Sequence, residues 1–301
     1  MGIIRKFYPS ETRKSLVDFR DFSSPQEYLG SGNLLDLIPR ILKGNELRGI
    51  AETIHRAARE NKPVIWALGA HVIKCGLSPL ILELMTRRMA TAISMTGAGA
   101  IHDFELALWG KTSEDVEEGL RDGSFGMTQD PAARMNFAIS SRVTNVRGIG
   151  KALQQELAHL DPEFSQLSLL YQAEIPVTVH VTLGADVIHM HPSANGAMIG
   201  QGSLNDFRLF TELVSGLQGG VFLNAGSAVT LPEVFLKALN LARNQGYKLD
   251  DFTTVNLDMI QHYRPNANVV TRPHIGGRGK GYSLTGHHEI LLPLLYHLLV
   301  N

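Results

Sequence analysis

Two short apolar runs in this chain end in turns of small residues and pass directly into helix-like segments. The first run and its turn cover residues 64–71 (VIWALGAH), and the second cover residues 91–99 (TAISMTGAG). Glycine has no Cβ, so such turns let an anion approach the N–H groups at the start of a helix. We therefore expect both turns to form anion sites at the carboxyl ends of parallel strands, where nucleotides commonly bind.

The second turn is followed within one helical turn by an imidazole and two carboxylates, from His102, Asp103 and Glu105. A third small-residue turn, at residues 225–227, follows another apolar run. Three such turns in one sheet favour a nucleotide or another anion as the ligand. The pattern is not the GxGxxG fingerprint, because His102 stands at the sixth position counted from Gly97. The residues that we expect to contact the nucleotide are Gly69, His71, Thr96, Gly97, Ala98, Gly99, His102, Asp103, Glu105, Gly226 and Ser227.

Histidine is unusually frequent, with twelve residues, and several of them are clustered. Imidazoles titrate near neutral pH, so histidines that converge on a pocket suit proton transfer. With nearby acids they could instead hold zinc or iron, but no compact motif such as HExxH is present, and we do not expect a metal. The positions behind this interpretation are His180, Asp186, His189 and His191 around one predicted strand, and His287, His288 and Glu289 near the end of the chain.

Two cationic residues and the single cysteine also bear on the chemistry. Arg272 precedes Pro273 and is the better candidate to hold an anionic group. Lys280, in the glycine-rich segment 276–281, could close over a carboxylate or a phosphate. Cys75 cannot form an internal disulfide, and its apolar surroundings favour a buried small hydrophobe.

The bulk composition excludes some classes of partner. The 301 residues include 28 basic and 29 acidic side chains, a balance that favours neither nucleic acid nor an anionic membrane as a partner. Neither a signal-peptide pattern nor a long apolar run is present, so we expect a cytoplasmic protein. The expected partner is a small-molecule substrate.

Helical and strand-like segments alternate along the chain, which predicts a parallel sheet with right-handed crossovers. The fold class is therefore α/β, with a Rossmann-like parallel sheet flanked by helices. We expect a helical arm at residues 1–45 and a single domain at residues 46–301. The predicted strands cover residues 64–68, 90–95, 175–183, 219–224, 252–257 and 269–271. The predicted helices cover residues 45–61, 80–88, 101–109, 206–217 and 233–243, a segment capped by Thr112 or Ser113, and the apolar C-terminal segment; residues 193–203 and 276–281 are predicted to be loops.

Over most of residues 60–300, the order of these patterns resembles the deoxyhypusine synthase family. Residues 68–76 stand where that family has its first NAD-binding turn, and residues 95–105 look like its Thr-Ala-Gly-Gly turn followed by acids. Residues 223–227 sit where it has a triple-glycine turn, and residues 287–295 match its final segment. A similar pattern also occurs in NAD-using ornithine cyclodeaminase-like domains. The resemblance implies a Rossmann-like fold, NAD bound between subunits, and a homotetramer.

Departures from that family lie mainly in the substrate half. The family forms an imine on a lysine, but the corresponding residues 270–274 contain none. Its double histidine is replaced by residues 229–232, and the acids that hold its polyamine are replaced by Gly184 and His189. We therefore expect neither a covalent lysine intermediate nor hypusine formation.

The sequence predicts NAD-dependent oxidation or transfer chemistry on a small amine or amino-acid-like substrate. In this hypothesis a pocket histidine removes the proton from the heteroatom, an acidic side chain orients it, and Arg272 holds a substrate carboxylate. The candidate catalytic residues are His189, His191, His287, His288, Glu289 and Arg272. Two alternatives stay open: a metal-dependent hydrolase that uses the His/Glu cluster, and a non-catalytic nucleotide-binding paralogue.

Overall fold

The computed structural model describes Arg20 and residues 23–301. The chain forms two compact units that divide between Gly49 and Ile50. In the first unit, the guanidinium of Arg48 donates hydrogen bonds to the backbone carbonyls of Leu35 and Ile38 and so ties down the segment before it. The helices of this part are α1 (Pro25–Ser31), η3 (Leu34–Leu37) and α2 (Leu42–Arg59), which continues into the second unit. Most of the predicted arm before α1 lies outside the described residues.

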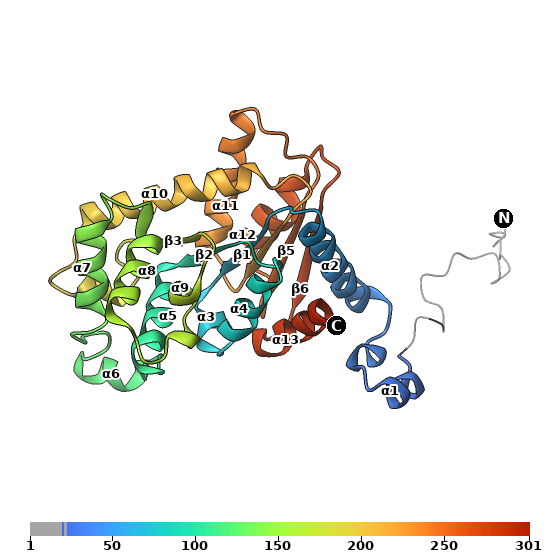
Figure 1. Ribbon diagram of the computed structural model, residues 1–301, viewed down its shortest axis with the longest axis horizontal. Helices are drawn as coiled ribbons and strands as arrows, with labels where there is room; N and C mark the ends of the chain where they lie inside the picture. The colour runs from blue at the N-terminus through green and yellow to red at the C-terminus, as the bar shows by residue number, and fades with distance from the viewer. Residues whose placement is uncertain (1–19, 21–22) are drawn as a thin grey trace, which may run out of the picture. The chain divides into compact units, whose positions relative to one another are not determined.

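The second unit contains a six-stranded sheet in the order β3-β2-β1-β4-β5-β6 (Figure 1). Every neighbouring pair of strands is parallel. The predicted Rossmann-like parallel sheet is therefore confirmed, and the strand order is the one typical of dinucleotide-binding domains. The strands are β1 (Val64–Leu68), β2 (Ala92–Thr96), β3 (Val177–His180), β4 (Val221–Ala225), β5 (Thr253–Asp258) and β6 (Lys280–Thr285).

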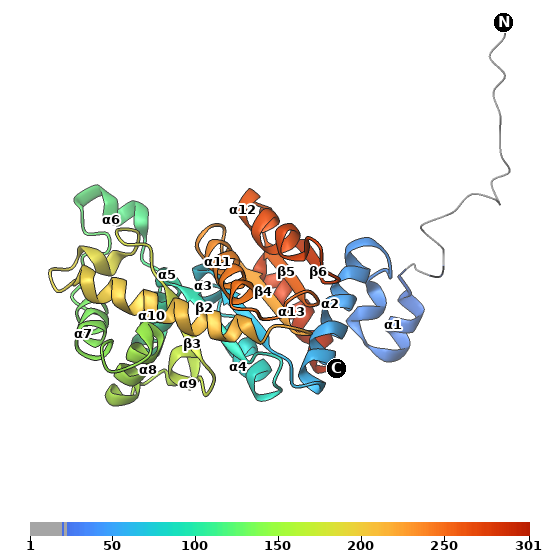
Figure 2. The same cartoon turned by 90° about the horizontal axis from the view of Figure 1, so that it is seen from above.

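Helices cover both faces of this sheet, as buried parallel strands require. In both views α10 (Gly196–Ser215) and α11 (Thr230–Asn244) cover one face (Figures 1 and 2). The core beneath them contains Phe222 and Phe235, whose rings stack 3.8 Å apart. The helices on the opposite face include α3 (Ala70–Lys74), α4 (Ser78–Thr86), α5 (Gly97–Trp109) and α13 (His288–Val300).

The long connection between β2 and β3 forms a helical layer beside the β3 end of the sheet. Asp206 of α10 anchors this layer, because its carboxylate accepts hydrogen bonds from the N–H groups of Ile149 and Val179. The elements of this layer are α6 (Val116–Asp122), α7 (Ala132–Arg142), α8 (Gly148–Leu160), η4 (Ser165–Leu167) and α9 (Leu169–Gln172). Shorter elements complete the unit: η5 (Val187–Met190), α12 (Tyr263–Pro265), the π-helical η6 (Asn266–Thr271) and η7 (Arg272–His274).

The last strand of the sheet was predicted at the wrong segment. Residues 269–271 form part of η6, and the sixth strand is β6, whose first residues were predicted to be a loop. A Cβ at Gly281 would collide with the backbone carbonyl of Val270, so β6 uses glycine where η6 crosses it closely. Glycine in a strand commonly marks such an approach, and here it made the strand resemble a loop.

Two further local predictions were also wrong. Of the predicted loop at residues 193–203, only residues 193–195 precede the helix, because α10 already begins at Gly196 with Asn195 as its cap. Gly202 serves helix packing, since a Cβ there would meet the side chains of Val143 and Ile149. The cap of α6 is Asp115 rather than Thr112 or Ser113.

Among the described residues, no helix is long and apolar enough to cross a membrane.

Candidate functional site at the carboxyl edge of the sheet

The carboxyl edge of the sheet, where all six strands end, carries the candidate site. The connections that follow β1 and β4 lead to opposite faces, so the order of the sheet reverses between these two neighbouring strands. Open α/β sheets bind ligands at such a switch point. The turns at Gly69 and Gly226 meet here: the Gly69 N–H donates to the Ala225 carbonyl at 2.8 Å, and a Cβ on Gly69 would collide with the Gly226 carbonyl.

His288, in the first turn of α13, closes over this switch point. Its side chain is 1% exposed, and its Nε2 donates a hydrogen bond to the Leu257 carbonyl at 3.1 Å. The ring lies against Gly226, and its centroid is 5.7 Å from that of the His71 ring. The remaining ring nitrogen, Nδ1, is buried and has no hydrogen-bond partner among the described residues. A buried imidazole nitrogen of this kind requires an explanation, and a bound ligand would supply one.

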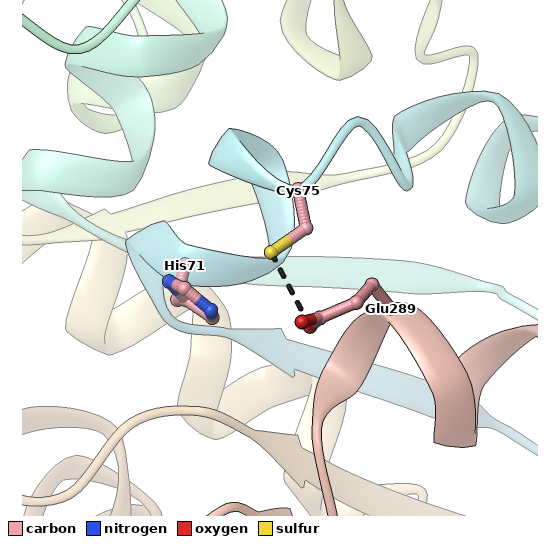
Figure 3. Close-up of side chains that lie close together, drawn as sticks. All are labelled: His71, Cys75 and Glu289. Atoms are coloured by element: carbon pink, nitrogen blue, oxygen red, sulfur yellow. Dashed lines mark hydrogen bonds between the residues drawn. The ribbon is translucent and has the colours of Figure 1, made fainter.

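Three side chains converge beside these histidines (Figure 3). His71 comes from α3, Cys75 is the residue that caps the end of α3, and Glu289 comes from α13. The Cys75 thiol donates to the Glu289 carboxylate, with Sγ and Oε2 3.7 Å apart. Burial and the neighbouring Glu289 carboxylate raise the pKa of the Cys75 thiol. Cys75 was predicted to be a buried hydrophobe, but it is partly exposed and has a polar partner. His287 is exposed, with Nδ1 3.7 Å from the same Glu289 carboxylate.

The glycine turn after β2 is filled by a carboxylate of the chain itself. Gly97 has no room for a Cβ because the Asp186 carboxylate lies there, and the Ala98 N–H donates a hydrogen bond to Asp186. Burial raises the pKa of Asp186, while this N–H favours its ionised form. The hydroxyl of Thr96 accepts from the Gly99 N–H at 3.1 Å. The first N–H groups of α5 therefore already have acceptors within the protein.

The side chains of His102 and Glu105 lie on one side of α5 and are bridged by Thr112. The Thr112 hydroxyl donates to Glu105 Oε2 at 2.5 Å, so Nδ1 of His102 donates to the hydroxyl oxygen at 2.6 Å. Both side chains line a cavity of about 220 Å³ that also includes Lys74 and Asp186. This cavity lies beside the end of α3, and it is small for a whole dinucleotide.

Asp103 points away from the carboxyl edge and supports α9. It is fully buried, and its carboxylate accepts hydrogen bonds from the Ser168 hydroxyl and the N–H groups of Leu169 and Leu170 at 2.7–2.8 Å. Burial raises its pKa to about 6 in spite of these donors. Asp103 is therefore placed to cap a helix rather than to contact a ligand.

The raised pKa of Asp103 gives a testable dependence of stability on pH. The folded protein keeps this proton up to about pH 6, whereas the unfolded chain loses it near pH 4, so the contribution to stability is present at low pH and is lost as the pH rises through 6. An Asp103→Asn variant lacks this titration. We expect its destabilisation relative to the wild type to be larger at pH 4 than at pH 7, by up to about 3 kcal/mol. Urea unfolding of both proteins at the two pH values measures the difference, and equal destabilisation at both would refute the assignment.

His189 and His191 belong to the connection after β3, at the opposite edge of the sheet from β6. Nδ1 of His189 accepts from the N–H groups of Gly184 and Asp186, while Nε2 is buried and without a hydrogen-bond partner in the described part of the chain. His191 bonds to the Ser193 hydroxyl. His180 at the end of β3 is buried, which lowers its pKa to about 3 and keeps it neutral.

Of the two cationic candidates, Arg272 lies in the β5–β6 connection and Lys280 lies at the start of β6. Arg272 is exposed and donates hydrogen bonds to Asn268 Oδ1 at 2.8 Å and to the Tyr263 hydroxyl at 3.1 Å. Lys280 is the first residue of β6 and therefore lies at the amino edge of the sheet, where its ammonium lies over the Tyr282 ring. Lys280 is thus on the opposite edge from the glycine turns.

A chain of hydrogen-bonded side-chain amides at the carboxyl edge was not predicted from the sequence. Nδ2 of Asn224 donates to Asn256 Oδ1, Nδ2 of Asn256 donates to Gln261 Oε1, and Nε2 of Gln261 donates to the Leu284 carbonyl, which links β4, β5 and β6. Oδ1 of Asn224 is buried without a hydrogen-bond partner among the described residues. The signal was present in the sequence, because each asparagine stands between two apolar residues of its strand.

Comparisons with known proteins relate the chain to a fold. No family model and no curated protein sequence matches it. Among solved structures, a conserved protein of LOR/SDH type from Methanococcus maripaludis S2 superposes with a TM-score of 0.50 at 15% identity, over 85% of this chain and 69% of that one. The ternary complex of AgrE with ornithine and NAD+ gives 0.50 at 14% identity, and a cysteine-to-alanine variant of AgrE with L-arginine gives 0.50 at 13%. Both matches cover 84% of this chain but only 32% of AgrE, and at such identities the likeness is one of fold.

Proposed function

We propose that this chain is a divergent deoxyhypusine synthase-like enzyme that binds NAD and acts on a small amine or amino-acid-like substrate. The chemistry would be oxidation or transfer, without hypusine formation. The observation that carries the proposal is the buried His288, whose unpartnered Nδ1 lies beside the Gly226 turn at the switch point of the sheet. AgrE, which has a similar fold, was crystallised with ornithine and NAD+, and this supports both the cofactor and the substrate class.

The residues at the switch point fit a dinucleotide phosphate. Gly69 is the N-cap residue of α3 and has no side chain that could accept a hydrogen bond. The first N–H groups of α3 therefore have no side-chain acceptor. By contrast, Thr96 and Asp186 already occupy the start of α5. We therefore assign the phosphate to the turn after β1, with the Gly226 and Ser227 turn beside it. When bound, NAD would accept a hydride from the substrate carbon.

The chain's own groups would then bind the substrate and move its proton. Nδ1 of His288 is free to accept a proton, because Nε2 is held as the donor to the Leu257 carbonyl. The same hydrogen bond to the Leu257 carbonyl fixes the orientation of the ring. His189, His191 and His287 are the further candidates for this step, and Arg272 is the candidate for a substrate carboxylate. We also propose the homotetramer that the family resemblance implies.

Dinucleotide binding is tested by thermal unfolding with NAD+ and with NADP+. A ligand at about 100 times its Kd stabilises the folded state by about 2.7 kcal/mol, so we expect a rise in Tm of several degrees. Ala70 is the first residue of α3, and Ala70→Asp would place a negative charge at the proposed phosphate position. An acidic residue suits the start of a helix, so the fold should persist while the shift is lost.

Ala70→Asn is the matched control, because it has nearly the same shape without the charge. It should keep most of the dinucleotide-dependent shift. The absence of a shift with either dinucleotide in the wild type would remove the basis of the proposal. A shift of equal size in Ala70→Asp would instead exclude the turn after β1 as the phosphate position.

A further inference from the structure

We propose that His71, Cys75 and Glu289 bind one divalent transition-metal ion of the zinc class. One potential ligand atom from each side chain lies within 4.8 Å of the other two, and the close-up shows all three turned into one space between α3 and α13 (Figure 3). No metal was expected from the sequence. The cluster lies beside the Gly69 and Gly226 turns, but the metal proposal rests on these three side chains alone and does not require the proposed dinucleotide.

The local backbone explains why these side chains meet. His71 and Cys75 are four residues apart, and the Cys75 N–H donates to the His71 carbonyl at 2.9 Å, which completes one helical turn. Residues at this spacing lie on the same face of a helix. Glu289 lies in the first turn of α13, which packs against α3. The third ligand thus comes from a segment more than two hundred residues away, and no local motif could reveal it.

The donor set matches the preferences of zinc. Imidazole nitrogen, thiolate sulfur and carboxylate oxygen are its ordinary protein ligands, with bonds of about 2.0–2.3 Å, which place ligand atoms about 3.3–3.8 Å apart in a tetrahedron. The Sγ–Oε2 distance of 3.7 Å already falls in this range. Three protein ligands leave the fourth position for water, an arrangement typical of catalytic rather than structural zinc.

The charges of the three groups also favour a cation. Without an ion, a thiolate at Cys75 would face the Glu289 carboxylate, whose Oε2 lies 3.7 Å from Sγ, and two negative charges would lie side by side. When the metal binds, the S–H bond breaks, its proton goes to solvent, and the sulfur electron pair forms the bond to the metal. One thiolate and one carboxylate then neutralise the two positive charges of the ion. The three side chains are half-buried or exposed, so the ion can enter from solvent.

Cobalt spectroscopy on the full chain tests the site directly. Metal-free, reduced protein is titrated with Co²⁺, and we expect a thiolate-to-cobalt charge-transfer band that saturates at one ion per chain and disappears when Zn²⁺ is added. Cys75 is the only cysteine, so the band can have no other source in the protein. Cys75→Ser should abolish it. Glu289→Gln and His71→Asn should each weaken Zn²⁺ binding in a chelator competition by about 100-fold or more, since loss of outer-shell partners alone costs 10–100-fold.

His159→Asn is the control, because this histidine is exposed on α8 and should leave the spectrum unchanged. Far-ultraviolet circular dichroism of each variant confirms that it has folded. No band in the wild type at stoichiometric Co²⁺ overturns the proposal. Glu289 is exposed, so we expect Glu289→Gln to fold. Unchanged Zn²⁺ affinity in this variant also overturns the proposal. Thermal shifts with NAD+ on the same samples report on the dinucleotide separately, so either proposal can fail without the other.

Discussion

An Asp206→Ala variant is expected to lose about 3–6 kcal/mol of unfolding free energy. Asp206 is 0% exposed, and its Oδ2 accepts hydrogen bonds from the N–H groups of Ile149, Gly150 and Val179 at 2.9–3.1 Å. The substitution would leave three buried N–H groups without an acceptor, at about 1–3 kcal/mol each, although water entering the cavity would offset part of this cost. This loss approaches the total stability of many domains.

The physical reason lies in the number of elements that one carboxylate joins. Ile149 and Gly150 begin α8, Val179 lies in β3, and Asp206 itself belongs to α10. Burial raises the pKa of Asp206 to about 7, so near neutral pH the site holds a mixture of the protonated and ionised forms. Because this one side chain joins α8, β3 and α10, its loss should loosen the β3 end of the sheet together with the helical layer beside it.

Urea unfolding monitored by circular dichroism measures this effect. Glu212→Ala is the matched control, because it removes a carboxylate from the same helix whose ion pair with Arg147 is mostly exposed, and it should change stability by less than about 1 kcal/mol. Asp206→Asn keeps an oxygen acceptor and should fall between the two variants. If Asp206→Ala is no less stable than Glu212→Ala, the three hydrogen bonds do not hold these elements together.

The sequence predicted the sheet well wherever strands are short apolar runs that end in small-residue turns. β1, β2 and β4 are of this kind, because buried parallel strands need apolar residues on both faces. The prediction failed at β6, where Gly281 serves a close approach of η6 that depends on tertiary structure. Local composition alone cannot distinguish a glycine that permits packing from one that permits a turn.

The candidate site could be predicted in part, for the same reason. The turns at Gly69 and Gly226 are visible in the sequence, and the parallel topology brings them together. Which turn has free N–H groups could not be predicted, because Asp186 reaches the Gly97 turn from a segment about ninety residues later. The meeting of Cys75 with Glu289 depends in the same way on how α13 packs against α3.

A Gly69→Ala variant is expected to lose about 2–4 kcal/mol of stability and its response to NAD+. A Cβ at Gly69 would collide with the carbonyl oxygen of Gly226 and approach the Ser227 nitrogen at 3.0 Å. Both obstacles are backbone atoms, so no side-chain rotation can relieve them, and overpacking of this kind costs about 1–3 kcal/mol and at times more. The Gly226 turn is itself fixed, because its N–H donates to the Leu257 carbonyl at 3.0 Å and the His288 ring lies against it.

The two turns must therefore move apart in Gly69→Ala, which breaks the bond from the Gly69 N–H to the Ala225 carbonyl and disturbs the proposed phosphate position. Gly200→Ala is the control: it lies within α10 with no atom near its would-be Cβ, and it should gain about 0.5–1 kcal/mol, as alanine does over glycine in a helix. Thermal unfolding of both variants with and without NAD+ measures the two effects. A Gly69→Ala protein with wild-type stability and an undiminished NAD+-dependent shift in Tm would show that the contact between the β1 and β4 turns is dispensable. The dinucleotide would then have to bind elsewhere on the carboxyl edge.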